Sequence, residues 1–476
     1  MPRLTRDRIT WLTYAQLGLW GFFLYGFGPV VPLLRDEQGT SAAVAGLHST
    51  AIAVGALLGG ALFAPLARRI GRGPAIWTGL AGVAAGVSAF GALHALPATL
   101  TAVALTATFG MMVISGVNVV LTGRHGPAAP AALSEANAAC AGMGILAPLV
   151  IGASVDNGWG WRPVMAVEVG LITLVALAAL TFRVRMPHAA PAAAAHGPTD
   201  VVPIAQADSV PAVVARDGPA DAVLVAQPDS VLAAARIPAA AAGRGPASDS
   251  ASAAAGPADT GTPGGPAGTA TDGNPSLPAP TGPLPWAYWI AWTLMAVTGS
   301  IEVCLSLWTA DVLRTHAGMA AGSAAAAVAA IVCGMFVGRL VGGRIALRHR
   351  PVPLLLAALG VSLAGFALFW LAPVGWLAVT GLVVLGLGNA LHYPLAISIA
   401  LAAAGPAADK AAGWASYSMG VGFGIAPVAL GRVADGVGPH LAFLLLPGFI
   451  AVAAVLAARL GRALRAPHPA GEHAPA

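Results

Sequence analysis

Glu302 lies in the middle of a long apolar run, and hydroxyl residues recur around it at helical spacing. Thr298, Ser306 and Thr309 share its side of a helix, because residues three or four positions apart project from one face. An ionisable carboxyl within an apolar helix is costly unless it faces water, a ligand or a partner. We therefore interpret Glu302 as a group that binds a proton or a cationic part of a ligand, with Ser306 beside it. The alternative is a protonated carboxyl that hydrogen-bonds to a neighbouring helix.

A second polar cluster, Asn389, His392 and Tyr393, comes just before Pro394. The spacing places all three on one side of a helix, and the proline weakens the local hydrogen-bond ladder. Histidine can bind a ligand or pass on a proton, while the amide and the phenol offer neutral hydrogen bonds. His392 is therefore a second candidate for proton coupling. The alternative is a set of interhelical hydrogen bonds that only holds the helices together.

Other apolar runs contribute further candidates for contacts with a small molecule. These are Gln16, Tyr25, Ser115 and Asn118. His48 and Glu168 also interrupt apolar runs, but for both we favour a structural role. Glu168 is close enough to one end of its run for the carboxyl to reach lipid headgroups.

The composition excludes a soluble globular protein. The chain has 476 residues, of which 57% are hydrophobic and only 9% charged, whereas soluble domains carry about a quarter charged residues. Cys140, Cys304 and Cys333 lie in apolar runs without ligand spacing, so neither disulfides nor a metal site is expected. Basic residues form short clusters between apolar runs, which argues against nucleic-acid binding. The sequence has no phosphate-binding loop and no nucleophile–base pair, so we expect neither an ATP-driven pump nor an enzyme, and no cofactor.

Twelve apolar runs are long enough to cross a bilayer as helices, at about 20 residues per crossing. Six precede and six follow a segment rich in Ala, Pro, Gly, Ser and Asp, which has too few apolar residues to form a core. We expect an N-terminal six-helix bundle (1–186), a disordered linker (187–283), a C-terminal six-helix bundle (284–465) and a disordered tail (466–476). The fold class is thus an all-α polytopic membrane protein. The predicted crossings are roughly 11–33, 41–64, 74–95, 98–121, 134–155, 163–182, 286–309, 319–342, 352–372, 376–401, 411–433 and 441–460.

The pattern Ala-Pro-x-x-x-Gly-x-x-x-Asp occurs twice, at 147–156 and at 426–435. Both copies fall in the fifth predicted helix of a half, which indicates that the halves arose by duplication. We expect the prolines and glycines to bend and pack these helices where the halves meet, and the final aspartates to cap or terminate their own helices. The bending and packing positions are Pro148, Gly152, Pro427 and Gly431.

Arginine and lysine are concentrated in alternate short loops between the predicted helices. Positively charged short loops stay in the cytoplasm, so both termini and the linker are expected there. The expected location is the cell (plasma) membrane, with the chain crossing it many times as a monomer.

Two six-helix halves, a cytoplasmic linker and basic turns after the second and eighth helices resemble the major facilitator superfamily of secondary transporters. The local marks are Arg-Ile-Gly-Arg at 69–72, Gly-Arg-Leu-Val-Gly-Gly-Arg at 338–344, and the paired Pro-x-x-x-Gly of helices 5 and 11. The resemblance implies two pseudo-symmetric bundles, a substrate cavity lined by helices 1, 4, 7 and 10, and gating at the cytoplasmic turns. We expect the basic residues of these turns to govern cytoplasmic closure, because they can interact with the carbonyl ends of adjacent helices. The alternative is that they set the topology alone. The candidate gating residues, beside the four Pro and Gly positions above, are Arg68, Arg69, Gly71, Arg72, Arg339 and Arg344.

The chain departs from the family's motifs at several points. Arg68 and Leu347 stand where the family's motif after helices 2 and 8 carries an acidic residue. Helix 4 lacks the arginine of the proton-coupled drug antiporters, and only Pro148 and Gly152 remain of their helix 5 motif. These departures weaken the case for drug–proton antiport.

The resemblance and the candidate residues together predict a secondary transporter of a small organic solute that works by alternating access. The candidate cavity residues are few, and they are mainly aromatic residues and amides with one acid. This composition favours proton-coupled efflux of a drug-like compound or metabolite. Gln16, Asn118 and Asn389 would instead suit uptake of a sugar-like or other polar nutrient. A third hypothesis is that the protein is a membrane sensor that keeps the transporter fold and signals through its linker. The expected partners are the small-molecule substrate, protons and the lipid bilayer.

Overall fold

The computed structural model describes residues 4–184, 283–346 and 348–465. The predicted linker up to residue 282 and the predicted tail 466–476 lie outside the described residues, so their disorder stays a prediction. The described residues from 4 to 184 and from 284 to 465 belong to one compact unit. Every regular element in them is helical.

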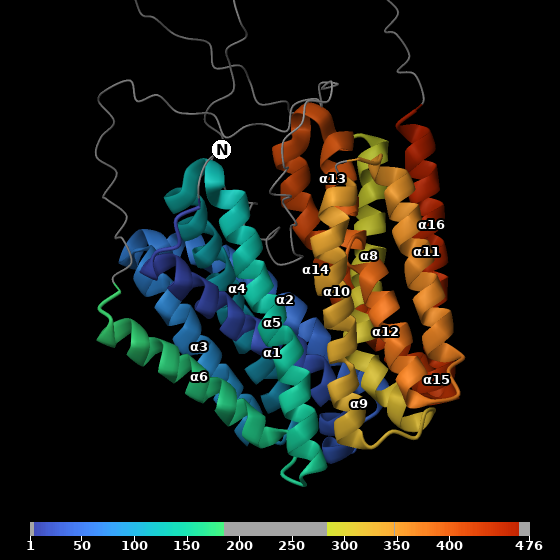
Figure 1. Ribbon diagram of the computed structural model, residues 1–476, viewed down its shortest axis with the longest axis horizontal. Helices are drawn as coiled ribbons and strands as arrows, with labels where there is room; N and C mark the ends of the chain where they lie inside the picture. Colours follow the sequence, from blue (N-terminus) through green and yellow to red (C-terminus); the bar gives the residue numbers. More distant parts are fainter. Residues whose placement is uncertain (1–3, 185–282, 347, 466–476) are drawn as a thin grey trace, which may run out of the picture. The chain divides into compact units, whose positions relative to one another are not determined.

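Twelve helical stretches in the described residues are long and apolar enough to span a membrane (Figure 1). This count confirms the twelve crossings that the sequence predicts. The six in the first half are α1 (Arg8–Gln38), α2 (Ala42–Ile70), α3 (Arg72–Ala92), α4 (Leu96–His125), α5 (Ala129–Asp156) and α6 (Arg162–Thr181).

Three of the six crossings in the second half are interrupted helices. The eighth, tenth and twelfth crossings each consist of two helices in sequence. The six crossings are α8 (Trp286–Thr315), α9 with α10 (Ala321–Ala327, Ala329–Ala346), α11 (Pro351–Trp370), α12 with α13 (Gly375–Asn389, His392–Ala404), α14 (Ala408–Val437), and α15 with α16 (Pro439–Ala442, Leu445–Ala463).

The interruption between α12 and α13 follows from Pro394. A proline has no N–H, so Pro394 cannot donate to the carbonyl four residues earlier, at Ala390. Ala390 and Leu391 are turn residues at that point. The break separates Asn389, the last residue of α12, from His392, the first of α13.

Capping residues set the first helix boundaries. The side chain of Asp7 accepts a hydrogen bond from the backbone N–H of Thr10 and begins α1, as N-cap aspartates do. Gly39 ends α1 with a φ of 60°, a left-handed conformation that favours glycine. The side chain of Ser41 then caps α2.

The two halves pack in the same way. In the first half α1 packs on α5, while α2 and α3 both pack on α4. In the second half α8 packs on α14, while α10 and α11 both pack on α12. These pairs correspond one to one, so the fold is two pseudo-symmetric six-helix bundles, as the duplicated motif predicts.

Large apolar side chains are exposed along the outer helices. Leu174 and Leu180 of α6 are 62% and 73% exposed, and Val452 and Val455 of α16 are 48% and 54% exposed. In water such surfaces would aggregate, whereas in a bilayer they face lipid tails that are equally apolar. Lipid is therefore the solvent for these surfaces.

Candidate functional site

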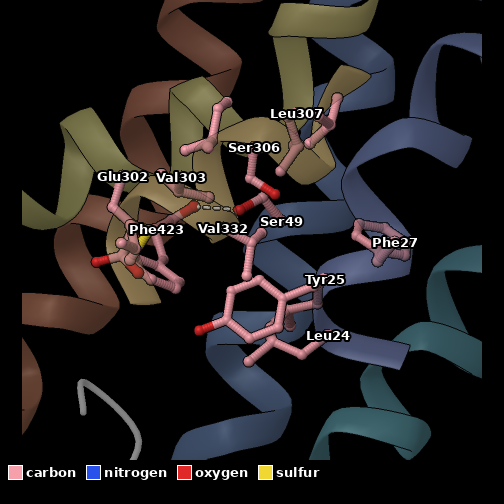
Figure 2. Close-up of a pocket in the computed structure, with 14 residues that line it drawn as sticks. Leu24, Tyr25, Phe27, Ser49, Glu302, Val303, Ser306, Leu307, Val332 and Phe423 are labelled. Carbon is pink, nitrogen blue, oxygen red and sulfur yellow. Dashed lines mark hydrogen bonds between the residues drawn. The ribbon is translucent and has the colours of Figure 1, made fainter. Parts of the chain in front are cut away.

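A cavity lies between the two bundles, lined by α1 and α2 from the first half and by α8, α10 and α14 from the second (Figure 2). Its volume is ≈ 60 Å³, which holds a few water molecules. Pockets for organic ligands measure roughly 300–1,000 Å³, so the bundles must move apart before such a solute can bind. The apolar lining residues are Leu24, Phe27, Ile52, Val303, Leu307, Val328, Ile331, Val332, Met335 and Phe423.

The polar part of the lining comes from Tyr25, Ser49, Glu302 and Ser306. Three of these, Tyr25, Glu302 and Ser306, are residues that the sequence nominates for substrate binding. Glu302 projects from α8 near Phe423 of α14, while Tyr25 projects from α1 (Figure 2). Of the described residues that line this cavity, Glu302 alone carries a carboxyl group.

Ser49 of α2 is a lining residue that sequence reasoning missed. Its hydroxyl donates to the backbone carbonyl of Phe423 at 2.7 Å, and the hydroxyl of Thr50 donates to the carbonyl of Gly424 at 2.6 Å. Both bonds join α2 to α14. The family resemblance points to helices 1, 4, 7 and 10 as the cavity wall, and neither α2 nor α14 is among them. The sequence feature that could have pointed to Ser49 is the pair of adjacent hydroxyl residues, Ser49 and Thr50, within an otherwise apolar helix.

The three predicted residues of the tenth crossing lie inside the second bundle and not on the cavity wall. Asn389, His392 and Tyr393 are all buried. The amide of Asn389 donates to the sulfur of Met335 at 3.8 Å, so Asn389 lies behind a cavity residue. His392 and the hydroxyl of Ser362 are 3.1 Å apart and hydrogen-bonded. These contacts hold α13 and α12 against α11 and α10.

Gln16, Ser115 and Asn118 also lie away from the cavity lining. Gln16 and Ser115 are buried in the first bundle, and Asn118 is half-buried. Both amide atoms of Gln16 lack a hydrogen-bond partner among the described residues. A rearrangement that opened the cavity would have to turn α1 or α4 to expose them.

The two polar residues for which we favour a structural role are fully buried. His48 contacts the hydroxyl of Thr99 at 3.0 Å and the carbonyl of Ala45 at 3.1 Å. Glu168 of α6 has 0% exposure, so the expectation that its carboxyl reaches the headgroups is wrong. The helix turns this residue toward the bundle interior.

Ion pairs hold α1 to α8 at one end of the two bundles. The guanidinium of Arg35 donates to both carboxylate oxygens of Asp311, at 2.5 and 2.9 Å. Arg314 and Asp36 form a second pair at 2.8 Å. The side chain of Asp311 is only 1% exposed, so Arg35 compensates a charge that is otherwise buried.

Asp435, the last residue of the second motif copy, also crosses between the bundles at this end. Its carboxylate accepts from the backbone N–H of Ala42 at 2.6 Å and of Ala43 at 3.1 Å. Its carboxylate therefore caps the N-terminus of α2, a helix of the other bundle, whereas the sequence pattern predicts that it caps or terminates its own helix. Gly431 permits the approach, because a Cβ there would lie 2.5 Å from the carbonyl oxygen of Ala42.

The first motif copy makes the corresponding contact. Asp156, at the end of α5, accepts from the hydroxyl of Ser323 in α9 at 3.3 Å. A Cβ on Gly152 would lie 2.5 Å from the carbonyl oxygen of Gly322. The duplicated motif is thus an inter-bundle contact in both halves. We call the Arg35–Asp311, Arg314–Asp36, Asp435–α2 and Asp156–α9 contacts the clasp.

The predicted gating arginines lie at the opposite end. Arg68, Arg69 and Arg72 are exposed around Gly71, whose φ is 90°. They form no salt bridge with another described residue. Arg339 is half-buried in α10.

The remaining predicted gating positions lie within helices. Arg344 belongs to α10, but its side chain lies outside the described part of the chain. Pro148 and Pro427 lie inside α5 and α14, each four residues before the glycine of its motif copy.

Ion pairs at this second end join helices of the first bundle only, among the residues described. Arg6 pairs with Glu135 at 2.5 Å, and Asp7 pairs with Arg124. Partial burial of Asp7 opposes ionisation, but hydrogen bonds from Arg124 and Thr10 outweigh it and lower the pKa of Asp7 to about 2. These pairs fix the start of α1 within its own bundle.

No group of three or more His, Cys, Asp and Glu side chains is arranged to hold a metal ion in the described residues. The side chains that line the cavity define the chemistry that can be described for the site. It offers one carboxyl, hydroxyl donors and a large apolar surface.

Comparison with known structures identifies the fold. A mutant of the nucleoside transporter NupG is 13% identical, with a TM-score of 0.65, over 95% of this chain and 98% of that one. A bacterial homologue of the human lysosomal transporter Spinster, inward-facing and occupied, is 13% identical with a TM-score of 0.65, over 97% and 98%. A mutant of the E. coli fucose:proton symporter FucP is 18% identical with a TM-score of 0.50, over 95% and 98%. No curated protein sequence matches the chain.

The sequence itself carries the family assignment. The model of the Major Facilitator Superfamily matches residues 17–411 and 313–476, and the fold has the two six-helix bundles that the motifs imply. This chain belongs to the Major Facilitator Superfamily of membrane transporters.

Proposed function

We propose that this protein is a secondary active transporter that exports a small amphipathic organic solute with a cationic group in exchange for protons, with Glu302 as the proton-coupling residue. The observation that carries the proposal is the position of Glu302 on the wall of the inter-bundle cavity. A carboxylate there can bind a proton or a cationic solute. Once protonated it is neutral and binds the cation more weakly, so the proton and the solute compete for Glu302. Competition of this kind couples two fluxes.

The chemistry of the lining supports a drug-like compound or metabolite over a sugar-like solute. A polar solute needs several hydrogen-bond partners in its site, whereas Tyr25, Ser49, Glu302 and Ser306 stand among apolar residues. The amides expected to serve a polar solute, Gln16, Asn118 and Asn389, do not line the cavity in this conformation. Uptake of a polar nutrient is the second candidate, since the structural relatives include a nucleoside transporter and a fucose:proton symporter.

The clasp supports an alternating-access cycle. It joins the bundles at one end, while the ion pairs described at the other end lie within one bundle. The distribution of basic loops predicts that the clasped end faces the outside of the cell membrane, with both termini in the cytoplasm. On this orientation the structure is closed to the outside, and opening requires the clasp to separate.

The decisive experiment is flux of a chemically diverse solute panel into and out of proteoliposomes, with and without an imposed pH gradient. We expect accumulation of an amphipathic solute that is driven by the gradient and abolished by Glu302→Gln. Glu37→Gln is the matched control, because Glu37 pairs with Arg162 within the first bundle. Transport of a sugar-like solute would favour the second candidate. Absence of flux for the whole panel would favour the sensor reading.

A further inference from the structure

A lateral groove opens in the second bundle between α10 and α11. α10 and α11 follow one another along the chain, and both pack against α12. Residues of α12 and of the turn before α13 form the floor of the groove between them. Its volume is ≈ 690 Å³, in the range of roughly 300–1,000 Å³ typical of ligand sites. The groove is more than ten times as large as the cavity between the bundles.

The wall of the groove is apolar and faces the bilayer. Val341 of α10 is 51% exposed, and Val361 of α11 and Leu387 of α12 are each 37% exposed. These side chains line the groove together with Leu354 and Leu391. Such a surface matches a hydrocarbon chain lying parallel to the helices.

The mouth of the groove is basic. Arg348, His349 and Arg350 belong to the turn between α10 and α11, line the groove and are exposed. Neither arginine forms a salt bridge with another described residue. No acidic side chain is among the described residues that line the groove. Two permanent positive charges at the end of an apolar channel are therefore not neutralised by any residue that the structure describes.

We propose that this groove binds an anionic phospholipid, with its phosphate on Arg348 and Arg350 and one acyl chain along Val341, Val361 and Leu387. Charge complementarity at the mouth and apolar complementarity along the wall both favour this occupant. A free anion would use only the arginines, and an uncharged lipid would use only the wall. The basic loops predict that this turn lies in the cytoplasm, where the anionic leaflet attracts Lys and Arg.

The site also touches the interruption of the tenth crossing. Gly388 and Leu391 line the floor of the groove, and they flank Asn389 at the break between α12 and α13. A bound acyl chain therefore packs on the segment that separates the groove from the inter-bundle cavity. The binding itself does not depend on the proposed transport, because it is measured without a substrate.

The test is native mass spectrometry of the purified full chain, which reports the lipids that stay bound after equilibration in equal amounts of phosphatidylglycerol and phosphatidylcholine. Two basic residues near an anionic headgroup give a preference of roughly tenfold or more. Arg348→Gln with Arg350→Gln should reduce that preference to about one. Arg459→Gln with Arg462→Gln is the matched control, because these exposed arginines end α16 and do not line the groove.

Further variants test the headgroup contact and the acyl-chain contact separately. Val361→Trp fills the groove but leaves the arginines, so it should lower retention of both lipids. Arg348→Lys with Arg350→Lys keeps both positive charges and should keep the preference for phosphatidylglycerol. If the glutamine variant fails to fold, loss of the preference in this lysine variant would contradict the proposal. Inorganic phosphate should not displace phosphatidylglycerol, because it lacks the acyl chain.

Any one of the following results for the variants and the competitor would overturn the proposal. They are an unchanged preference in the glutamine variant, equal loss in the Arg459 and Arg462 control, and displacement of the lipid by inorganic phosphate. Occupation of the groove by a segment of the chain itself would appear as an absence of retained lipid in the wild type, which also contradicts the proposal.

Discussion

Removal of the Asp435 carboxylate should loosen the clasp selectively. Asp435 accepts from two backbone N–H groups at the start of α2, and this contact exists only while the bundles touch at that end. Asp435→Ala therefore destabilises the clasped state and leaves the open state nearly unaffected. The consequence is a change in population and not a loss of folding.

The size of the shift follows from the type of contact. A side chain that caps a helix N-terminus contributes roughly 0.5–2 kcal/mol, and its negative charge near the helix dipole adds about 0.3–1 kcal/mol. Asp435 is exposed, so solvent screening reduces the charge contribution. We take about 1 kcal/mol, which raises the ratio of open to clasped molecules about fivefold.

The assay is a distance measurement by pulsed electron paramagnetic resonance. Trp159 lies between α5 and α6 and Trp376 near the start of α12, and both are 71% exposed. Spin labels on Cys at these two positions, in a background without the native cysteines, report the separation of the bundles at the clasped end. Asp435→Ala should increase the weight of the longer distance about fivefold relative to the shorter one, and Asp435→Asn should have a smaller effect.

Glu37→Gln is the control for the same measurement. Glu37 pairs with Arg162 at 2.6 Å within the first bundle, so its removal breaks an exposed ion pair at this end without touching the second bundle. The distance distribution should stay that of the wild type. An unchanged distribution in Asp435→Ala, or an equal shift in Glu37→Gln, would refute the interpretation of Asp435 as an inter-bundle latch.

Three further predictions concern the ion pairs and the packing around the clasp and at the start of α1. Arg35→Gln leaves Asp311 buried and uncompensated, so it should open the clasp more than Asp435→Ala does, and Arg35→Leu with Asp311→Leu should restore much of the clasped population in the same distance measurement. Gly152→Leu should clash with the opposing carbonyl of α9 and favour the open state by the same readout, whereas a distribution like that of the wild type would show that the contact is not tight. Asp7→Asn keeps a side-chain oxygen that can cap α1 but loses the ion pair with Arg124, so it should cost up to about 1 kcal/mol of stability. Because the folded pKa of Asp7 is about 2, below its ordinary value of 3.8, the advantage of the wild type in thermal unfolding should be full above about pH 4 and decline as the pH falls toward 2. A difference that does not vary with pH in this window would contradict the ion pair.

The membrane crossings were predictable because lipid imposes a simple rule. A helix must stay apolar for about 20 residues to cross the hydrocarbon core, and this rule recovers twelve crossings. The duplicated motif indicated the two-bundle architecture for a similar reason, since a repeated sequence in a repeated environment folds alike. Glu302 was found because a carboxyl in an apolar run is rare and costly.

Contacts between the bundles were not predictable from the sequence. Asp435 and Ala42 are 393 positions apart, and nothing in either segment indicates that they meet. The helical spacing of Asn389, His392 and Tyr393 does not say whether their shared face points to the cavity or to the bundle interior. That choice depends on how α12 and α13 pack against α10 and α11, which local sequence does not encode.

The measurement that bears most directly on the proposed function is substrate-induced proton movement across the membrane of proteoliposomes, read with an entrapped pH-sensitive dye. The substrate is the solute that the flux panel identifies. Wild-type protein should move protons when that solute is added, and Glu302→Gln should transport the solute without moving protons or not transport it at all. Proton movement in Glu302→Gln equal to that of the wild type would contradict the assignment of Glu302 as the proton-coupling residue.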